Sequence, residues 1–270
     1  MNAPDESALL PDPEPLTASG AGRRLPANAD SPLPASASLR AWLDEHRFLM
    51  VRDAARDVDG ARSWLARLGP PIEHERRADG VLELDGSKDD SEVLRGCAGM
   101  PLHKDGLLMG IDVPYVGIFC ERFRDVQDGR TRICDAQSAL KALPDELLAL
   151  LGTRGIEAQA VDTDYYLKEG GTWHPLPALI ETPEGQSLNL GLPYDEGDRP
   201  SWRVRVAGVD PTTSDAALAE LRRVLHDPRF TYQHAWREGD LLLLANHRVL
   251  HGREPYRGDR VLANLQARRA

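Results

Sequence analysis

The sequence predicts a mainly β fold with flanking helices (α+β), built on a double-stranded β-helix core of the jelly-roll or cupin type. Three observations predict it. The apolar runs have strand length and are separated by turns rich in Gly, Pro, Asn and Asp. Helical periodicity is confined to a few segments, without the βαβ alternation of a parallel sheet. At 270 residues with 41% hydrophobic content, the chain can bury one large core.

The first part of the chain differs in composition from the rest. Residues 1–37 are rich in Pro, Ala, Ser, Asp and Glu and show no sustained apolar period. Such a segment buries too little apolar surface to offset the loss of chain entropy on folding. We therefore expect residues 1–37 to form a flexible tail and residues 38–270 to form the domain.

Helices are predicted where apolar residues recur at helical spacing. One begins near Ser38, where Leu39, Trp42 and Leu43 recur at helical spacing. The others are 57–68, 138–148 with a break at Pro144, and 214–225, which is the clearest. Strands are predicted for 48–51, 81–84, 113–120, 130–134, 156–161, 178–181, 187–190, 202–206, 230–236 and 240–244. The turn at 127–129 before the strand 130–134 is typical of a β-hairpin.

Charge and cysteine content exclude several classes of protein. The net charge of −10 disfavours a nucleic-acid-binding surface, which needs clustered Lys and Arg. Cys97, Cys120 and Cys134 are odd in number and lack CxxC spacing, so we expect reduced thiols. No stretch approaches the ~18 apolar residues of a membrane span, and the N-terminus has no signal-sequence pattern. We expect a cytoplasmic protein with neither a nucleic-acid nor a membrane partner.

Three residues indicate a metal site. His103 and Asp105 are two positions apart, so on a β-strand their side chains share one face. His251 follows a run of four leucines and supplies a second imidazole. Two imidazoles and one carboxylate leave three positions of an octahedron open, as in Fe(II) oxygenases, whereas structural zinc prefers four closed ligands. The set predicts a catalytic mononuclear Fe(II) site.

Arg260 and Thr131 are candidates for binding a keto acid. A five-carbon keto-diacid that chelates iron leaves its distal carboxylate inside the fold, where an unpaired anion is costly. A guanidinium fork at Arg260 would supply paired donors to that carboxylate, and the hydroxyl of Thr131 would add another. We therefore expect 2-oxoglutarate and O2 as co-substrates.

From Leu39 to the C-terminus the chain resembles the taurine dioxygenase-like (TauD/TfdA) family of Fe(II)/2-oxoglutarate oxygenases. Within it, the chain is most similar to the branch that acts on amino-acid-derived isonitriles, the paerucumarin-type isonitrile dioxygenases. The matching stretches are PLHKDG (101–106), DGRTR (128–132), LHDPRFTYQHAW (225–236) and EGDLLLLANHRVLHGRE (238–254). The resemblance implies His103, Asp105 and His251 as iron ligands, with Arg260 and Thr131 on 2-oxoglutarate.

Two positions depart from the family pattern. Asn264 stands where many relatives carry a second arginine that binds an anionic substrate, and Ala245 stands where Asp is common. The retained Asp105 argues against a halogenase, which lacks this carboxylate. Asn264 and three residues of the segment 162–175, Tyr165, Lys168 and His174, are candidate substrate contacts.

The resemblance implies an oxygenase of secondary metabolism that hydroxylates or desaturates a small amino-acid-derived metabolite, with isonitriles as the leading class. Such an enzyme would work beside an isonitrile synthase. The alternatives are a TauD-like hydroxylase of another small molecule, such as a sulfonate or a free or carrier-bound amino acid, and a cupin-like metal-binding protein without oxidative turnover. A homodimer is a further expectation.

Overall fold

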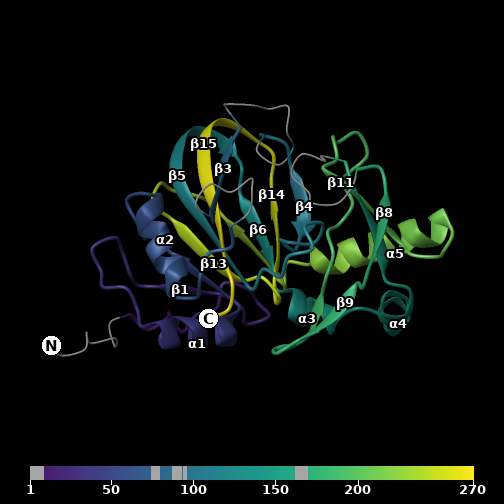
Figure 1. Ribbon diagram of the computed structural model, residues 1–270, viewed down its shortest axis with the longest axis horizontal. Helices are drawn as coiled ribbons and strands as arrows, with labels where there is room; N and C mark the ends of the chain where they lie inside the picture. The colour runs from purple at the N-terminus through teal and green to yellow at the C-terminus, as the bar shows by residue number, and fades with distance from the viewer. Residues whose placement is uncertain (1–8, 74–79, 87–92, 94–95, 162–169) are drawn as a thin grey trace.

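The computed structural model describes residues 9–73, 80–86, 93, 96–161 and 170–270 (Figure 1). The helices are α1 (Ser36–His46), α2 (Val58–Ala66), α3 (Ala136–Leu140), α4 (Asp145–Arg154) and α5 (Pro211–Leu225). The strands are β1 (Arg23–Leu25), β2 (Phe48–Val51), β3 (Val81–Asp85), β4 (Met100–His103), β5 (Tyr115–Asp128), β6 (Thr131–Cys134), β7 (Ile156–Ala160), β8 (Trp173–Leu176), β9 (Leu179–Thr182), β10 (Gly185–Leu188), β11 (Trp202–Val206), β12 (Thr231–His234), β13 (Leu241–Ala245), β14 (Leu250–Arg253) and β15 (Tyr256–Ala267).

Two facing sheets form the core. The six-stranded sheet has the order β1-β2-β13-β5-β15-β3, and the four-stranded sheet has the order β12-β6-β14-β4. Apolar side chains from both sheets, among them Val116 and Ile133, share one buried cluster between them. The predicted fold class, a mainly β protein with a jelly-roll core and flanking helices, is confirmed.

The four leucines of β13 explain why this strand shows no polar alternation. Leu242 and Leu244 face the space between the two sheets, whereas Leu241 and Leu243 face the cluster that includes α1 and α2. Both faces of the strand are therefore buried. Gly117 of β5 allows the close approach of α2, because a Cβ there would lie 2.3 Å from the side chain of Leu65. Figure 1 shows α1 and α2 on the outer side of this sheet.

The second half of the chain adds two small sheets beside the core, with the orders β11-β7-β8 and β10-β9. Helices α3, α4 and α5 contribute to the buried cluster of this region. The predicted helix 138–148 divides into α3 and α4, with Pro144 as the residue before α4. No helix in the described part of the chain is long and apolar enough to cross a membrane.

The predicted hairpin at 127–134 is not formed. The turn exists, with both Asp128 and Gly129 at positive φ, but it passes the chain from one sheet to the other. Strand β5 already has β13 and β15 as neighbours, so it offers no edge to β6. Strand β6 pairs instead with β12 and β14.

The structure also differs from the predicted flexible tail. Within residues 9–37, Leu9, Leu25 and Ala27 are buried in the cluster beneath α1 and α2. Strand β1 adds to the six-stranded sheet by pairing in parallel with β2. The sequence did not predict this packing because single apolar residues that are widely spaced give no periodic signal. The pairing of β1 with β2 uses main-chain hydrogen bonds, which leave no side-chain pattern in the sequence. Residues 1–8 lie outside the described residues.

Candidate metal centre

Two neighbouring strands bring the histidines together. His103 is the last residue of β4 and His251 is the second residue of β14, and the antiparallel register places them opposite each other. Their ring centroids lie 4.5 Å apart. Both side chains are largely buried, with exposed fractions of 13% and 6%. Cross-strand pairing thus unites residues that are far apart in the sequence.

Asp105 reaches the same point from a turn, not from the strand that its spacing predicted. Strand β4 ends at His103, and Gly106 follows Asp105 with a φ of +91°. The side chain of Asn246 holds this turn: its Oδ1 accepts from the Asp105 N–H at 3.2 Å, and its Nδ2 donates to the Asp105 carbonyl at 3.1 Å. The position of Asp105 is therefore set by these two hydrogen bonds to its main chain and not by the alternation of side chains along a strand.

The three side chains converge on one point. Oδ1 of Asp105 lies 3.4 Å from Nε2 of His103 and 3.5 Å from Nε2 of His251. All ligand atoms of the three residues lie within 4.8 Å of one another, and in the described part of the chain no other His, Cys, Asp or Glu group has this geometry. The arrangement can hold one metal ion by two nitrogens and one oxygen.

The protonation of the imidazoles suits metal binding. Nδ1 of His103 donates to the Pro101 carbonyl over 2.9 Å, which leaves the lone pair of Nε2 toward Asp105. Burial, with a smaller contribution from His103, lowers the pKa of His251 to about 4. His251 is therefore neutral at physiological pH. Its buried Nδ1 has no hydrogen-bond partner among the described residues.

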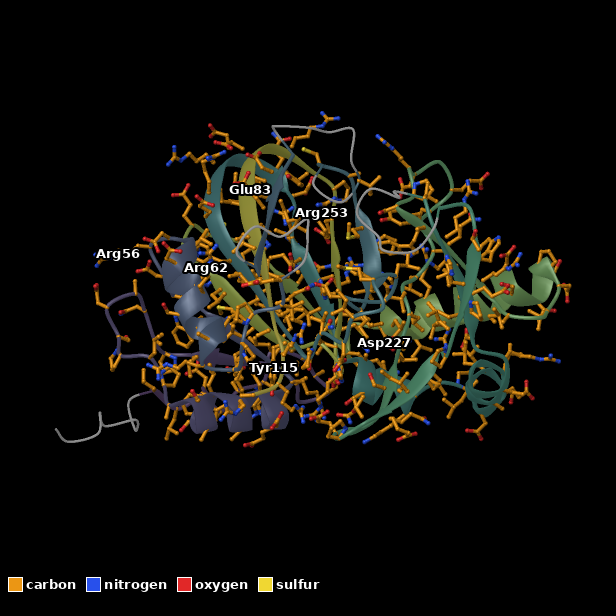
Figure 2. All side chains as sticks on the ribbon, viewed as in Figure 1. Arg56, Arg62, Glu83, Tyr115, Asp227 and Arg253 are labelled. Carbon is orange, nitrogen blue, oxygen red and sulfur yellow. The ribbon has the colours of Figure 1, made fainter. Side chains whose placement is uncertain are left out.

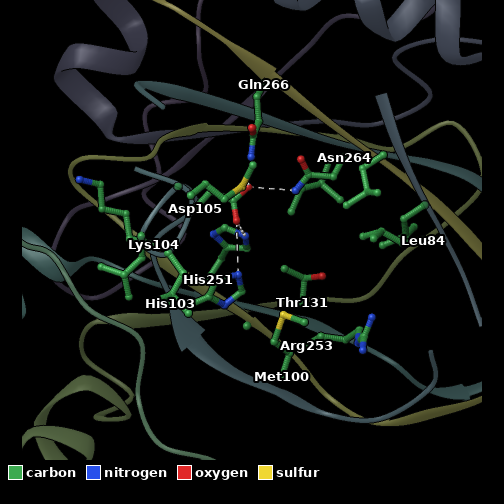
Figure 3. Close-up of a pocket in the computed structure, with 18 of the residues that line it drawn as sticks. Leu84, Met100, His103, Lys104, Asp105, Thr131, His251, Arg253, Asn264 and Gln266 are labelled. Carbon is green, nitrogen blue, oxygen red and sulfur yellow. Dashed lines mark hydrogen bonds and ion pairs between the residues drawn. The ribbon is translucent and has the colours of Figure 1, made fainter. Parts of the chain in front are cut away.

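These residues line a cavity of about 80 Å³, several times the ~10–15 Å³ that one water needs. Its wall is mostly apolar, with Leu82, Met100, Leu108, Trp202 and Leu262 among the lining side chains. Figure 3 shows Asp105 between the two histidines and the amides of β15, while Lys104 points away from them.

Arg260 and Thr131, the predicted keto-acid contacts, both line this cavity. Arg260 is 3% exposed, and its Nε has no hydrogen-bond partner among the described residues. Burial, and next the charge of Arg253, lower its pKa to about 10, so it remains a cation at neutral pH. The Thr131 hydroxyl accepts from Nε1 of Trp236 at 3.0 Å and keeps its hydrogen to donate. A buried guanidinium of this kind favours an anionic ligand.

Arg253 also lines the cavity, and Figure 2 shows it at the upper end of the sheets, away from Tyr115 at the lower end. Its Nε donates to the carbonyl of Ala98 at 2.8 Å and its Nη2 donates to the carbonyl of Val93 at 2.5 Å. These contacts tie the approach to β4 onto β14.

The candidate substrate contacts separate into three groups. Asn264 lines the cavity, whereas His174 lies on β8 and is not among the lining residues. Tyr165 and Lys168 lie outside the described residues. Sequence reasoning missed Gln266, which lines the cavity two residues after Asn264. The period of two along a strand was the signal that could have found it.

Comparison with known proteins supplies the family. The family model "Taurine catabolism dioxygenase TauD, TfdA family" matches residues 12–266. A tyrosine isonitrile desaturase from Erwinia amylovora is 27% identical over 81% of this chain and 75% of the relative. An (S)-phenoxypropionate/alpha-ketoglutarate-dioxygenase from Sphingobium herbicidovorans is 26% identical over 80% of this chain and 79% of the relative.

Solved structures share the fold. The PvcB protein from Pseudomonas aeruginosa superimposes with a TM-score of 0.69 and 24% identity, over 92% of this chain and 86% of PvcB. PvcB is described as an Fe, alpha-ketoglutarate dependent oxygenase from an isonitrile synthetic pathway. Because the family model spans nearly the whole chain, the protein belongs to the TauD/TfdA family and is a 2-oxoglutarate-dependent dioxygenase that uses Fe(II), 2-oxoglutarate and O2.

Proposed function

We propose that this dioxygenase hydroxylates or desaturates a small amino-acid-derived metabolite, with an isonitrile as the leading substrate class. The observation that carries the chemistry is one cavity that contains both a His-Asp-His ligand set and a buried guanidinium. Fe(II) and 2-oxoglutarate, when bound, would supply the electrons that activate O2 for attack on a C–H bond. The protein supplies geometry, charge matching and exclusion of water.

Each residue of the site has one role in this proposal. Nε2 of His103, Nε2 of His251 and Oδ1 of Asp105 would hold the iron, since these atoms face one another. The guanidinium of Arg260 would bind the distal carboxylate of 2-oxoglutarate, with the Thr131 hydroxyl as a further donor. The dianion would thereby give the buried cation a partner.

The apolar wall of the cavity supports a substrate with an aromatic or aliphatic side chain. Leucine and methionine side chains surround the metal centre, and Trp202 packs beside His103 with ring centroids 5.2 Å apart. The resemblance to a tyrosine isonitrile desaturase favours an amino-acid skeleton. Hydroxylation would insert one oxygen atom into a C–H bond, whereas desaturation would remove two hydrogens and form water. In both cases 2-oxoglutarate and O2 yield succinate and CO2.

An anaerobic titration with Fe(II) and 2-oxoglutarate tests the residue roles. The weak visible charge-transfer band of the chelate should form with the wild-type protein and should be lost in a His251→Ala variant. A well-folded wild-type protein without the band would favour the cupin-like alternative, in which the site binds metal without oxidative turnover.

A substrate screen tests the metabolite class. With isonitriles derived from tyrosine, tryptophan and other apolar amino acids, the enzyme should convert 2-oxoglutarate to succinate. The amount of succinate should equal the amount of a product that has lost two hydrogens or gained one oxygen. The parent amino acids, sulfonates and aryloxy acids are the comparison set. If succinate formation is coupled to product formation only with the comparison compounds, the alternative TauD-like hydroxylase would replace the isonitrile proposal.

The proposal also implies a supplier for the substrate. An isonitrile group must be installed on the amino acid before this enzyme acts, so an isonitrile synthase is the proposed pathway partner. A homodimer stays a prediction, and an interface between two copies would be sought among exposed apolar side chains. Within the described residues, the large hydrophobic side chains that are exposed are Leu10 and Val161.

A further inference from the structure

Two amide side chains from one strand contact the carboxylate of Asp105. Nδ2 of Asn264 donates to Oδ2 over 3.1 Å, and Nε2 of Gln266 donates to the same oxygen over 2.7 Å. Both amides are buried, with exposed fractions of 7% and 2%. They lie two residues apart on β15, so they share one face of the strand. Figure 3 shows both of them on the side of Asp105 opposite the histidines.

The two oxygens of this carboxylate therefore have different surroundings. Oδ2 accepts from the two amides, while Oδ1 is the oxygen that lies 3.4 Å and 3.5 Å from the imidazole nitrogens. Two donors on one oxygen fix the rotation of the carboxylate about its side-chain bonds. Since both donors are neutral amides, they orient the charge of Asp105 without cancelling it.

We propose that Asn264 and Gln266 are positioning residues that hold Asp105 as a one-oxygen ligand of the metal. This inference rests on the metal site of the proposed function. It gives Asn264 a role on the metal ligand, in place of the substrate contact expected from its position in the family pattern. Residues that contact ligands in this way typically control both the affinity of a site and the orientation of the ligand.

The positioning has a reason in the local structure. Asp105 lies in a turn after β4, and Asn246 restrains its main chain but not its side chain. An unrestrained carboxylate could bind a metal through both oxygens. That would occupy a fourth position of an octahedron and leave two, whereas a keto-acid chelate and O2 need three. A carboxylate held at Oδ2 keeps the third position open.

Titration with Co(II), under anaerobic conditions and without 2-oxoglutarate, tests the inference apart from turnover. Asn264→Leu and Gln266→Met remove one donor each at similar volume. Gln233→Met is the matched control, because Gln233 is an exposed residue of strand β12. Loss of either donor should weaken Co(II) binding by roughly 10- to 100-fold, the range typical for residues that support metal ligands. The visible spectrum of the bound Co(II), which reports coordination number, should also change, whereas the control should leave both unchanged.

Each outcome decides the inference. If both variants bind Co(II) with wild-type affinity and spectrum, the positioning role is wrong while the metal site stands. If the wild-type protein binds no Co(II), the metal site of the proposed function fails, and the positioning role fails with it. Where a variant does not fold, Asn264→Ala or Gln266→Ala removes the donor without adding atoms. Melting of the metal-free protein separates loss of fold from loss of the ligand.

Discussion

Replacing Arg260 by Met should change metal-free stability and 2-oxoglutarate binding in opposite directions. Burial lowers the pKa of Arg260 to about 10, because the folded protein disfavours its charge. At ~1.36 kcal/mol per pKa unit, the charged Arg260 lowers the free energy of unfolding by roughly 3 kcal/mol at every pH below about 10. The contact with the Tyr256 ring, 4.5 Å from the guanidinium carbon, offsets ~2 kcal/mol of this loss, because the pair is desolvated. The metal-free Met variant should therefore be about 1 kcal/mol more stable.

The same variant should bind 2-oxoglutarate poorly. A hydrogen bond to a charged group contributes ~1.5–3 kcal/mol, so each bond lost should weaken binding by roughly 10- to 150-fold. Urea unfolding without metal and anaerobic calorimetry with Fe(II) and 2-oxoglutarate measure the two effects. Arg257→Met, an exposed arginine on the same strand, is the control. Wild-type affinity in the Arg260 variant, or a metal-free protein destabilised by several kcal/mol, would refute this reasoning.

Three further predictions concern the same site. Alanine at His103, Asp105 or His251 should abolish Fe(II)-dependent succinate formation, and full activity in any of them would remove that residue from the ligand set. Thr131→Val should weaken 2-oxoglutarate binding and, by leaving Nε1 of Trp236 without its acceptor, lower the free energy of unfolding by ~1–3 kcal/mol, whereas Thr131→Ser should retain most of both. The folded pKa of His251, about 4, lies below the unfolded value of 6.5, so only the unfolded state gains this proton as the pH falls. The free energy of unfolding of the metal-free protein should therefore fall as the pH is lowered from 6.5 to about 4. It should fall less steeply in the His251→Gln variant, and equal pH dependence in the two proteins would contradict the lowered pKa of His251.

Much of the fold was predictable because most of its elements are marked by local patterns. The four leucines of β13 predict a buried strand, and the amphipathic spacing of α5 predicts a helix, each from a few consecutive residues. The hairpin prediction was wrong because a turn signal fixes the local bend and not the strand that is paired next. The packing of residues 9–37 was missed because their burial depends on surfaces built later in the chain.

The candidate site was predictable to the extent that its chemistry lies in short motifs. His103, Asp105 and His251 were recognised from residue type and spacing, and the structure brings them together. Strand geometry gave a wrong account of how Asp105 reaches the site, because β4 ends before it. Gln266 carries no charge and belongs to no catalytic motif, so the sequence marks it only by its spacing of two from Asn264, and its contact with Asp105 reveals its role.

Strand β15 has a consequence for how the chain folds during synthesis. It carries Arg260, Asn264 and Gln266, and it lies between β5 and β3 in the six-stranded sheet. Its partners are made more than a hundred residues earlier, so the sheet depends on pairings of high contact order, which form slowly. At the ~5–20 residues per second of translation, β5 and β3 are made several to tens of seconds before β15, so their edges toward it stay unpaired during that time. Strand β15 therefore both completes the sheet and adds three polar residues to the cavity. A product truncated before it would keep His103, Asp105 and His251 but would lack Arg260 and the two amides on Asp105, and it would expose strand edges that favour aggregation.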